Sequence, residues 1–172
     1  MRFEGRSIIV TGAGSGIGRA AALLFAEEGG SVVVADVAES AEETAHAIVK
    51  AGGVAMAIRM DAGSEEDVVR TVSLACTNFG GLDIMFANAG ISGGMASIFE
   101  TDVSMITEVL RVNLVGPYLA IKHSAPLIAE RAASIARGGA IVLTASVAGI
   151  APSGRVRMKA AQNKPTRLIA VQ

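Results

Sequence analysis

The chain has 172 residues, of which 51% are hydrophobic and 18% charged, and its net charge is −1 at pH 7. This length suits one domain with a sizeable core. No apolar run approaches the roughly 20 residues that span a bilayer, and the first residues lack the apolar core of a signal peptide. We therefore expect a cytoplasmic protein with no membrane partner.

The charge is unevenly distributed along the chain. Residues 1–154 carry ten Lys or Arg and sixteen Asp or Glu, whereas residues 155–172 carry five Lys or Arg and no acid. Neither part resembles the clustered basic surface of a nucleic-acid-binding protein, so we expect no nucleic-acid partner. We interpret residues 1–154 as one domain and residues 155–172 as an atypical basic tail.

The sequence offers no disulfide framework and no metal site. Its single cysteine, Cys76, cannot form an internal disulfide, and no His/Cys cluster has metal-ligand spacing. Cys76 lies in a helical apolar pattern, which favours a buried small side chain over a reactive thiol.

Strand and helix patterns alternate along the chain. The predicted strands cover residues 7–10, 31–35, 55–60, 84–87 and 140–144, and the predicted helices cover 16–28, 38–51, 65–78 and 104–137. A doubled glycine follows each of the four predicted helices, where a left-handed residue is expected. These pairs are Gly29-Gly30, Gly52-Gly53, Gly80-Gly81 and Gly138-Gly139. The alternation is typical of a parallel sheet with helices on both faces.

A glycine-rich turn joins the first predicted strand to the first helix. It reads T-G-x-x-x-G-x-G and comprises Thr11, Gly12, Gly14, Ser15, Gly16, Ile17 and Gly18. Backbone without Cβ atoms can approach a pyrophosphate closely, and the amides and positive dipole end of the following helix favour its negative charge. The turn therefore predicts dinucleotide binding, with a flexible loop as the alternative.

Asp36 ends the second predicted strand. A carboxylate there can accept hydrogen bonds from a ribose 2′-hydroxyl and would repel a 2′-phosphate. Neither Ser15 nor Val37 supplies a positive charge to hold that phosphate. The position therefore favours NAD over NADP, although an ordinary carboxylate at a strand end or helix N-cap is an alternative.

Further polar residues lie where later predicted strands end or on the long predicted helix. They are Asp61 with Ala62, the Asn88-Ala89-Gly90 turn, Asn113 and Ser146. Each alone has a structural explanation, respectively a cap, a turn former, a helix-interior solvent contact and a strand-end hydroxyl. Taken in order over residues 6–149, however, these motifs resemble the short-chain dehydrogenase/reductase family.

The resemblance implies a Rossmann-type doubly wound parallel sheet with strand order 3-2-1-4-5. It also implies that Asp61 and Ala62 lie near the adenine ring, that the turn at 88–90 shapes the cofactor crevice, and that Asn113 and Ser146 are catalytic. The implied reaction moves a hydride between NAD and a small-molecule alcohol or carbonyl substrate. A tyrosine moves the accompanying proton, and a lysine lowers the pKa of that tyrosine.

The Tyr-x-x-x-Lys pair that the resemblance implies downstream of Ser146 is absent. Lys159 and Asn163 stand near its expected places, and the chain's one tyrosine is Tyr118. Tyr118 and Lys122 have the required spacing, but they precede Ser146 on the long predicted helix. Helix packing and solvation explain these two residues without any chemistry.

The tail also departs from the family pattern. Without the family's last two strands, the predicted strand at 140–144 becomes an open apolar edge. We interpret residues 155–172 as a truncated, altered or frame-shifted C-terminus, because their charge pattern and Pro165 break from what precedes them.

The sequence thus favours an NAD-dependent alcohol or carbonyl oxidoreductase, with a catalytically silent dinucleotide-binding module as the alternative. A methyltransferase built on a similar sheet is disfavoured, because Asn88, Asn113 and Ser146 follow the dehydrogenase order. The resemblance further implies a homo-oligomer formed through the helix at 104–137.

Overall fold

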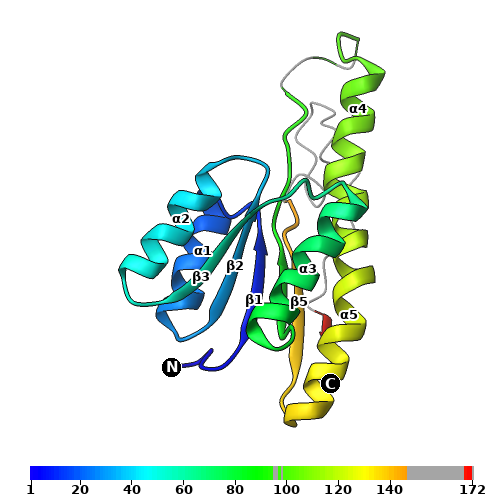
Figure 1. The fold of residues 1–172 in the computed structure, drawn as a ribbon. Coiled ribbons are helices and arrows are strands. Elements are labelled where there is room, and N and C mark those ends of the chain that lie inside the picture. Colours follow the sequence, from blue (N-terminus) through cyan, green and yellow to red (C-terminus); the bar gives the residue numbers. More distant parts are fainter. Residues whose placement is uncertain (95–96, 98, 147–168, 172) are drawn as a thin grey trace.

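A parallel sheet covered by helices on both faces forms the protein, which confirms the predicted α/β class (Figure 1). The computed structural model describes residues 1–94, 97, 99–146 and 169–171. The strands are β1 (Ser7–Thr11), β2 (Ser31–Asp36), β3 (Val54–Arg59), β4 (Ile84–Ala87), β5 (Gly139–Leu143) and β6 (Ile169–Val171). The helices are α1 (Gly16–Glu27), α2 (Ser40–Lys50), α3 (Glu65–Phe79), α4 (Val103–Leu110), the π-helical turn η1 (Arg111–Val115) and α5 (Gly116–Ile135).

The strand order is β3-β2-β1-β4-β5-β6, so the predicted order 3-2-1-4-5 is confirmed. The first five strands are parallel, and β6 pairs antiparallel with β5, with Gly139 opposite Val171 and Ile141 opposite Ile169. The expectation that β5 forms an open edge is therefore wrong along this paired stretch. Residues 147–168, which include the predicted domain boundary at 154 and most of the tail, lie outside the described residues.

Side-chain alternation along the central strands divides the core into two halves. Ile8 and Val10 of β1 pack against the helix pair α1 and α2, whereas Ile9 between them packs with residues of α3 and α5. Figure 1 shows the two helix pairs on opposite sides of the sheet. Because both faces are covered, the middle residues of β1 and β2 are all apolar, as expected of a buried parallel sheet.

The first three helices begin and end within two residues of their predicted bounds. The residues with positive φ after the helices are also as predicted, except after α5. Gly29, Gly52 and Gly80 have positive φ after α1, α2 and α3, as predicted. The left-handed residue after α5 is instead Ala136, at φ 51°. Gly139 serves a different purpose, because a Cβ there would collide with Ile128 and lie 2.8 Å from the Asp83 carbonyl oxygen.

The predicted single helix at 104–137 is a column of three segments, in which α4 passes through η1 into α5 (Figure 1). A π-helical turn holds one residue more than the α-helix around it and often marks a functional site. Among the described residues, no helix is long and apolar enough to cross a membrane.

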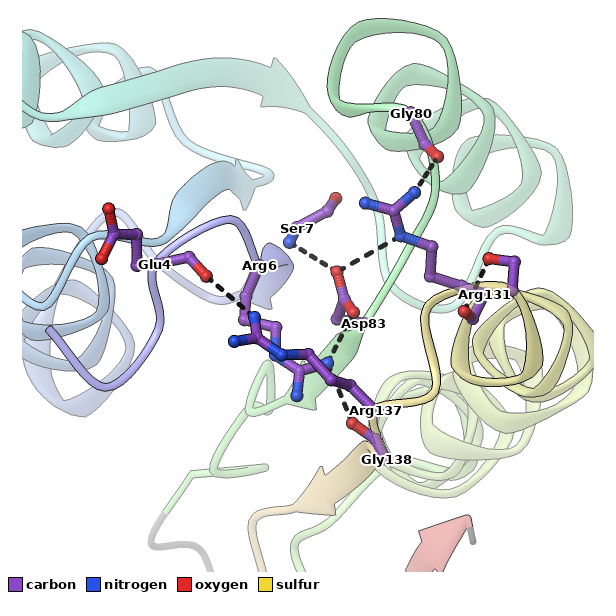
Figure 2. A network of polar contacts seen from close by, with 9 residues as sticks. Glu4, Arg6, Ser7, Gly80, Asp83, Arg131, Arg137 and Gly138 are labelled. Carbon is purple, nitrogen blue, oxygen red and sulfur yellow. Dashed lines mark hydrogen bonds and ion pairs between the residues drawn. The ribbon is translucent and has the colours of Figure 1, made fainter.

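A buried carboxylate joins the amino ends of the central strands. Asp83 is 1% exposed, and its side chain accepts the Ser7 N–H at 2.9 Å and an Arg6 N–H at 2.8 Å. Arg6 also donates to the Gly138 carbonyl at 3.0 Å, and Arg131 lies 3.8 Å from the same carboxylate (Figure 2). The starts of β1, β4 and β5 are therefore held together through two side chains, those of Asp83 and Arg6.

Replacing this carboxylate should destabilise the fold. In Asp83→Asn the guanidinium groups of Arg6 and Arg131 lose their countercharge in a largely buried setting, so we expect a loss of about 3 kcal/mol of unfolding free energy. Urea denaturation measures this as a lower midpoint at unchanged slope. The exposed Arg2–Glu28 pair provides the control: Arg2→Ala should leave the midpoint almost unchanged. Equal midpoints for Asp83→Asn and the parent protein would contradict the expectation.

Candidate functional site

A cleft of about 710 Å³ opens at the carboxyl ends of the strands. It lies between β1 and β4, where the strand order reverses: β2 and β3 lie on one side of β1, and β4 and β5 lie on the other. Open α/β sheets bind their ligands at this switch point. Among the residues predicted from sequence, the cleft is lined by Thr11, Gly12, Ser15, Gly16, Ile17, Asp36, Asp61, Ala62, Asn88, Ala89, Gly90, Asn113 and Ser146.

Two predicted site residues, Gly14 and Gly18, are buried behind the cleft instead of lining it. A Cβ on Gly18 would collide with the Gly12 carbonyl oxygen and lie 2.7 Å from the Asn88 amide nitrogen. A Cβ on Gly14 would collide with the Ser40 hydroxyl. These glycines therefore allow the turn to pack closely against α1 and α2.

The turn itself approaches the end of β4 closely. Gly12 has φ +66°, and a Cβ there would lie 2.9 Å from the Ala89 Cα atom. The turn leads into α1, whose N-cap residue is Ser15. The positive end of that helix therefore faces the cleft region where the turn exposes its backbone, an arrangement that favours an anionic ligand.

Hydrogen bonds tie the carboxyl ends of three strands together below the cleft. The Thr11 hydroxyl accepts the backbone N–H groups of Asn88 and Ala89, each at 3.0 Å. The Asn88 amide donates to the Thr11 carbonyl at 3.2 Å, and its oxygen accepts the Thr144 hydroxyl at 2.9 Å. Asn88 is therefore more than a local turn former, since it links β1, β4 and the end of β5.

Asp36 directs its carboxylate toward the glycine-rich turn. One oxygen accepts the Gly14 N–H at 2.8 Å, and the other accepts the Ala38 N–H at 3.0 Å. The second bond caps the turn before α2, while the side chain also lines the cleft. Both sequence interpretations of Asp36, the cap and the cleft carboxylate, thus describe contacts that this residue can make.

Asp61 belongs to an ion-pair cluster at the end of β3. Its carboxylate accepts the Gly63 N–H at 2.8 Å and pairs with Arg111 at 2.8 Å. Arg111 donates two further hydrogen bonds to Glu108, each at 2.8 Å. Partial burial raises the pKa of Asp61, but the bonds from Arg111 and Gly63 outweigh it and hold that pKa below its ordinary value.

Asn113 lies within η1 and is 5% exposed. Its amide donates to the Ile91 carbonyl at 2.8 Å, and its oxygen accepts the Ile91 N–H at 2.8 Å. The alternative of a solvent contact is therefore wrong, because this side chain fixes the backbone that follows the turn at 88–90. Ser146 also lines the cleft, beyond the end of β5.

Tyr118 and Lys122 lie outside the residues that line the cleft. The Tyr118 side chain is 60% exposed on α5, and Lys122 donates to Glu65 at 2.6 Å. That bond raises the pKa of Lys122 and favours its charged form. Lys122 therefore joins α5 to α3 at the surface, whereas Tyr118 is more exposed than the packing interpretation expects.

Sequence reasoning missed several residues of the cleft, notably Val37, Glu108, Arg111 and Thr144. The only sequence signal for Arg111 is that it stands two positions before Asn113. In the part of the chain that the structure describes, no three His, Cys, Asp or Glu residues gather as metal ligands.

Thr11→Val tests the hydroxyl that joins β1 to β4. Valine keeps the shape but leaves two partly buried N–H groups without their acceptor, so we expect a loss of about 2 kcal/mol of unfolding free energy. Thr144→Val removes one exposed bond to Asn88 and should cost less than about 1 kcal/mol. Urea denaturation of both variants makes the comparison, and equal losses would count against the structural role of Thr11.

Comparison with known proteins identifies the family. The family described as "short chain dehydrogenase" matches residues 6–161. The cis-4-hydroxycyclohexanecarboxylate dehydrogenase of Sinomonas cyclohexanicum is 42% identical over 147 residues, 86% of this chain and 57% of the relative. The cyclohexanol dehydrogenase of Acinetobacter sp. (strain SE19) is 39% identical over 150 residues, 87% and 58% of the two chains.

A solved structure gives the same result. The short-chain dehydrogenase/reductase of Burkholderia phymatum in complex with NAD superposes with a TM-score of 0.86 at 31% identity, covering 94% of this chain and 56% of that one. The chain therefore spans a little more than half the length of these relatives. The family match, the strand order and the shared fold agree, and this chain belongs to the short-chain dehydrogenase/reductase family.

Proposed function

We propose that this chain binds NAD(H) in the cleft at the carboxyl ends of its strands. The observation that carries the proposal is the turn at 11–18, which combines the close approach of Gly12 to Ala89 with the amino end of α1. When bound, this cofactor supplies a hydride acceptor or donor. On the protein side, the turn would hold the pyrophosphate, and Asp61 with Ala62 would hold the adenine end.

Asp36 supports a preference for NAD over NADP. Its carboxylate lines the cleft at the end of β2, where a 2′-phosphate would bring a second negative charge close to it. The adjacent Val37 side chain is exposed and offers no compensating charge. The ribose 2′-hydroxyl of NAD, in contrast, can donate a hydrogen bond to the carboxylate.

The parent activity that we propose is oxidoreduction of a small alcohol or carbonyl compound. Two relatives are named for cyclic alcohols, which supports a substrate of this class. Ser146 lines the cleft beside the turn at 88–90 and would position the substrate oxygen. Asn113 would act by holding the backbone of Ile91 in place.

A second function, binding without turnover, is favoured by the position of Tyr118. It is the one tyrosine in the sequence, and it lies on α5 outside the cleft lining. Loss of a positioned proton donor typically lowers rates by about 10²- to 10⁴-fold. We propose on this basis that the chain alone is a dinucleotide-binding module with little turnover.

Two measurements separate these functions. Titration with NADH, followed by nucleotide fluorescence, tests binding, and a panel of cyclic and linear alcohols with NAD tests turnover by the appearance of NADH. Binding without turnover supports the module, while robust turnover would contradict it and support the oxidoreductase. Absence of NADH binding would overturn both.

Asp36→Asn tests the cofactor preference. Removing the charge relieves repulsion of the 2′-phosphate, so we expect the ratio of NADPH to NADH dissociation constants to fall by about 10-fold. Glu39→Gln is the matched control, because it removes an exposed carboxylate nearby that does not line the cleft. An unchanged ratio in Asp36→Asn would show that this carboxylate does not set the preference.

We also propose that two copies associate through the α4–α5 face. Val103, Leu114 and Tyr118 are each exposed on this column, and we propose that a second copy covers them. Leu114→Glu should then shift the protein toward monomer in sedimentation velocity. Val49→Glu, a change at an exposed position on α2, should leave the distribution unchanged. A monomeric parent protein would contradict this proposal.

A further inference from the structure

We infer that Arg111 positions the Asp61 carboxylate to recognise the adenine amino group of the dinucleotide. This inference rests on the proposed cofactor binding and adds a residue that sequence motifs did not indicate. Arg111 would act through Asp61 and need not touch the adenine itself. It is therefore a positioning residue for the adenine end of the cleft.

The geometry of Asp61 carries the first step. Its Oδ1 accepts the Gly63 N–H, and its Oδ2 contacts the Arg111 guanidinium at 2.8 Å. Each carboxylate oxygen has two lone pairs, so each can accept one more hydrogen bond. With both oxygens anchored, the remaining lone pairs are held in fixed directions along the cleft wall, where an amino group could donate to them.

The guanidinium is itself held in place from the opposite side. Two parallel hydrogen bonds join Arg111 to Glu108, both at 2.8 Å and one turn earlier in the same helical column. Such a bidentate pair fixes the plane of the guanidinium as well as its position. Arg111 thus bridges two carboxylates, one on the helical column and one at the end of β3.

Two glycines, Gly63 and Gly116, leave room for this bridge. A Cβ on Gly63 would collide with the Arg111 guanidinium, so Arg111 would have to shift from its place over the turn after β3 if residue 63 carried a side chain. A Cβ on Gly116 would lie 3.0 Å from the Ala62 carbonyl oxygen. The turn that carries Asp61 and Ala62 is therefore seated directly against η1 and the start of α5.

Charge provides an independent reason for a cation at this position. The described cleft lining contains three carboxylates, those of Asp36, Asp61 and Glu108, and one cationic side chain, that of Arg111. A dinucleotide brings two further negative charges on its pyrophosphate. Removing Arg111 would leave the Asp61 carboxylate without its countercharge as well as without its anchor.

The test compares two nucleotides that differ only at the adenine amino group. For Arg111→Ala we expect the dissociation constant of NADH to rise about 5-fold, the loss of one well-placed hydrogen bond at a partly exposed site. For reduced nicotinamide purine dinucleotide, in which a hydrogen atom replaces that amino group, the constant should change less than about 2-fold. A merely structural or long-range electrostatic role would affect the two nucleotides equally.

Further variants define the mechanism. Asp61→Ala and the double variant Asp61→Ala/Arg111→Ala should show equal losses of NADH affinity, because Arg111 acts through Asp61. Arg111→Lys keeps the charge without the fork and should recover only part of the discrimination between the two nucleotides. Arg2→Ala is the matched control, since it removes an exposed arginine paired with Glu28 outside the cleft.

Each outcome decides the inference. If the parent protein binds NADH but Arg111→Ala weakens both nucleotides equally, or neither, the positioning role is overturned while the proposed cofactor binding stands. If the parent protein binds neither nucleotide, both proposals fail. Urea midpoints of all variants are measured in parallel, and a discrimination lost only in variants that are partly unfolded at the assay temperature would also overturn the role.

Discussion

The buried carboxylate of Asp83 fixes the relative height of the three strands on which the cleft depends. It holds the starts of β1 and β4 through Ser7 and the approach to β5 through Arg6 and Gly138. Parallel strands that begin at a fixed height also end at a fixed height, because each residue adds a constant rise. The carboxyl ends therefore present their side chains at one level.

At their carboxyl ends the same three strands are joined again, by hydroxyl and amide groups instead of charged groups. Thr11, Asn88 and Thr144 form a short chain of hydrogen bonds across the strand ends. Uncharged links suit this position, because a buried ion pair there would compete with an anionic ligand. The central strands are thus joined by charged groups at their amino ends and by neutral hydrogen bonds at their carboxyl ends, beneath the cleft.

Sequence reasoning located the strands and most of the cleft because both depend on local patterns. Residues that end neighbouring parallel strands meet at one edge, so Asp36 and Asn88 could be placed from their positions alone. Arg111 could not, because its place depends on which way the long helix faces. Helical periodicity does not reveal a π-turn, and neither the left-handed Ala136 nor the antiparallel pairing of β6 has a local signal.

The π-turn makes the length of the helical column as important as its composition. Because η1 holds an additional residue, α4 is rotated by about 100° relative to a continuous α-helix running into α5. Arg111 and Asn113 both belong to this turn, one bonded toward β3 and the other toward the segment after β4. Losing a single residue here would rotate both side chains away from their partners together, whereas a substitution at 111 or 113 would remove only one of the two links.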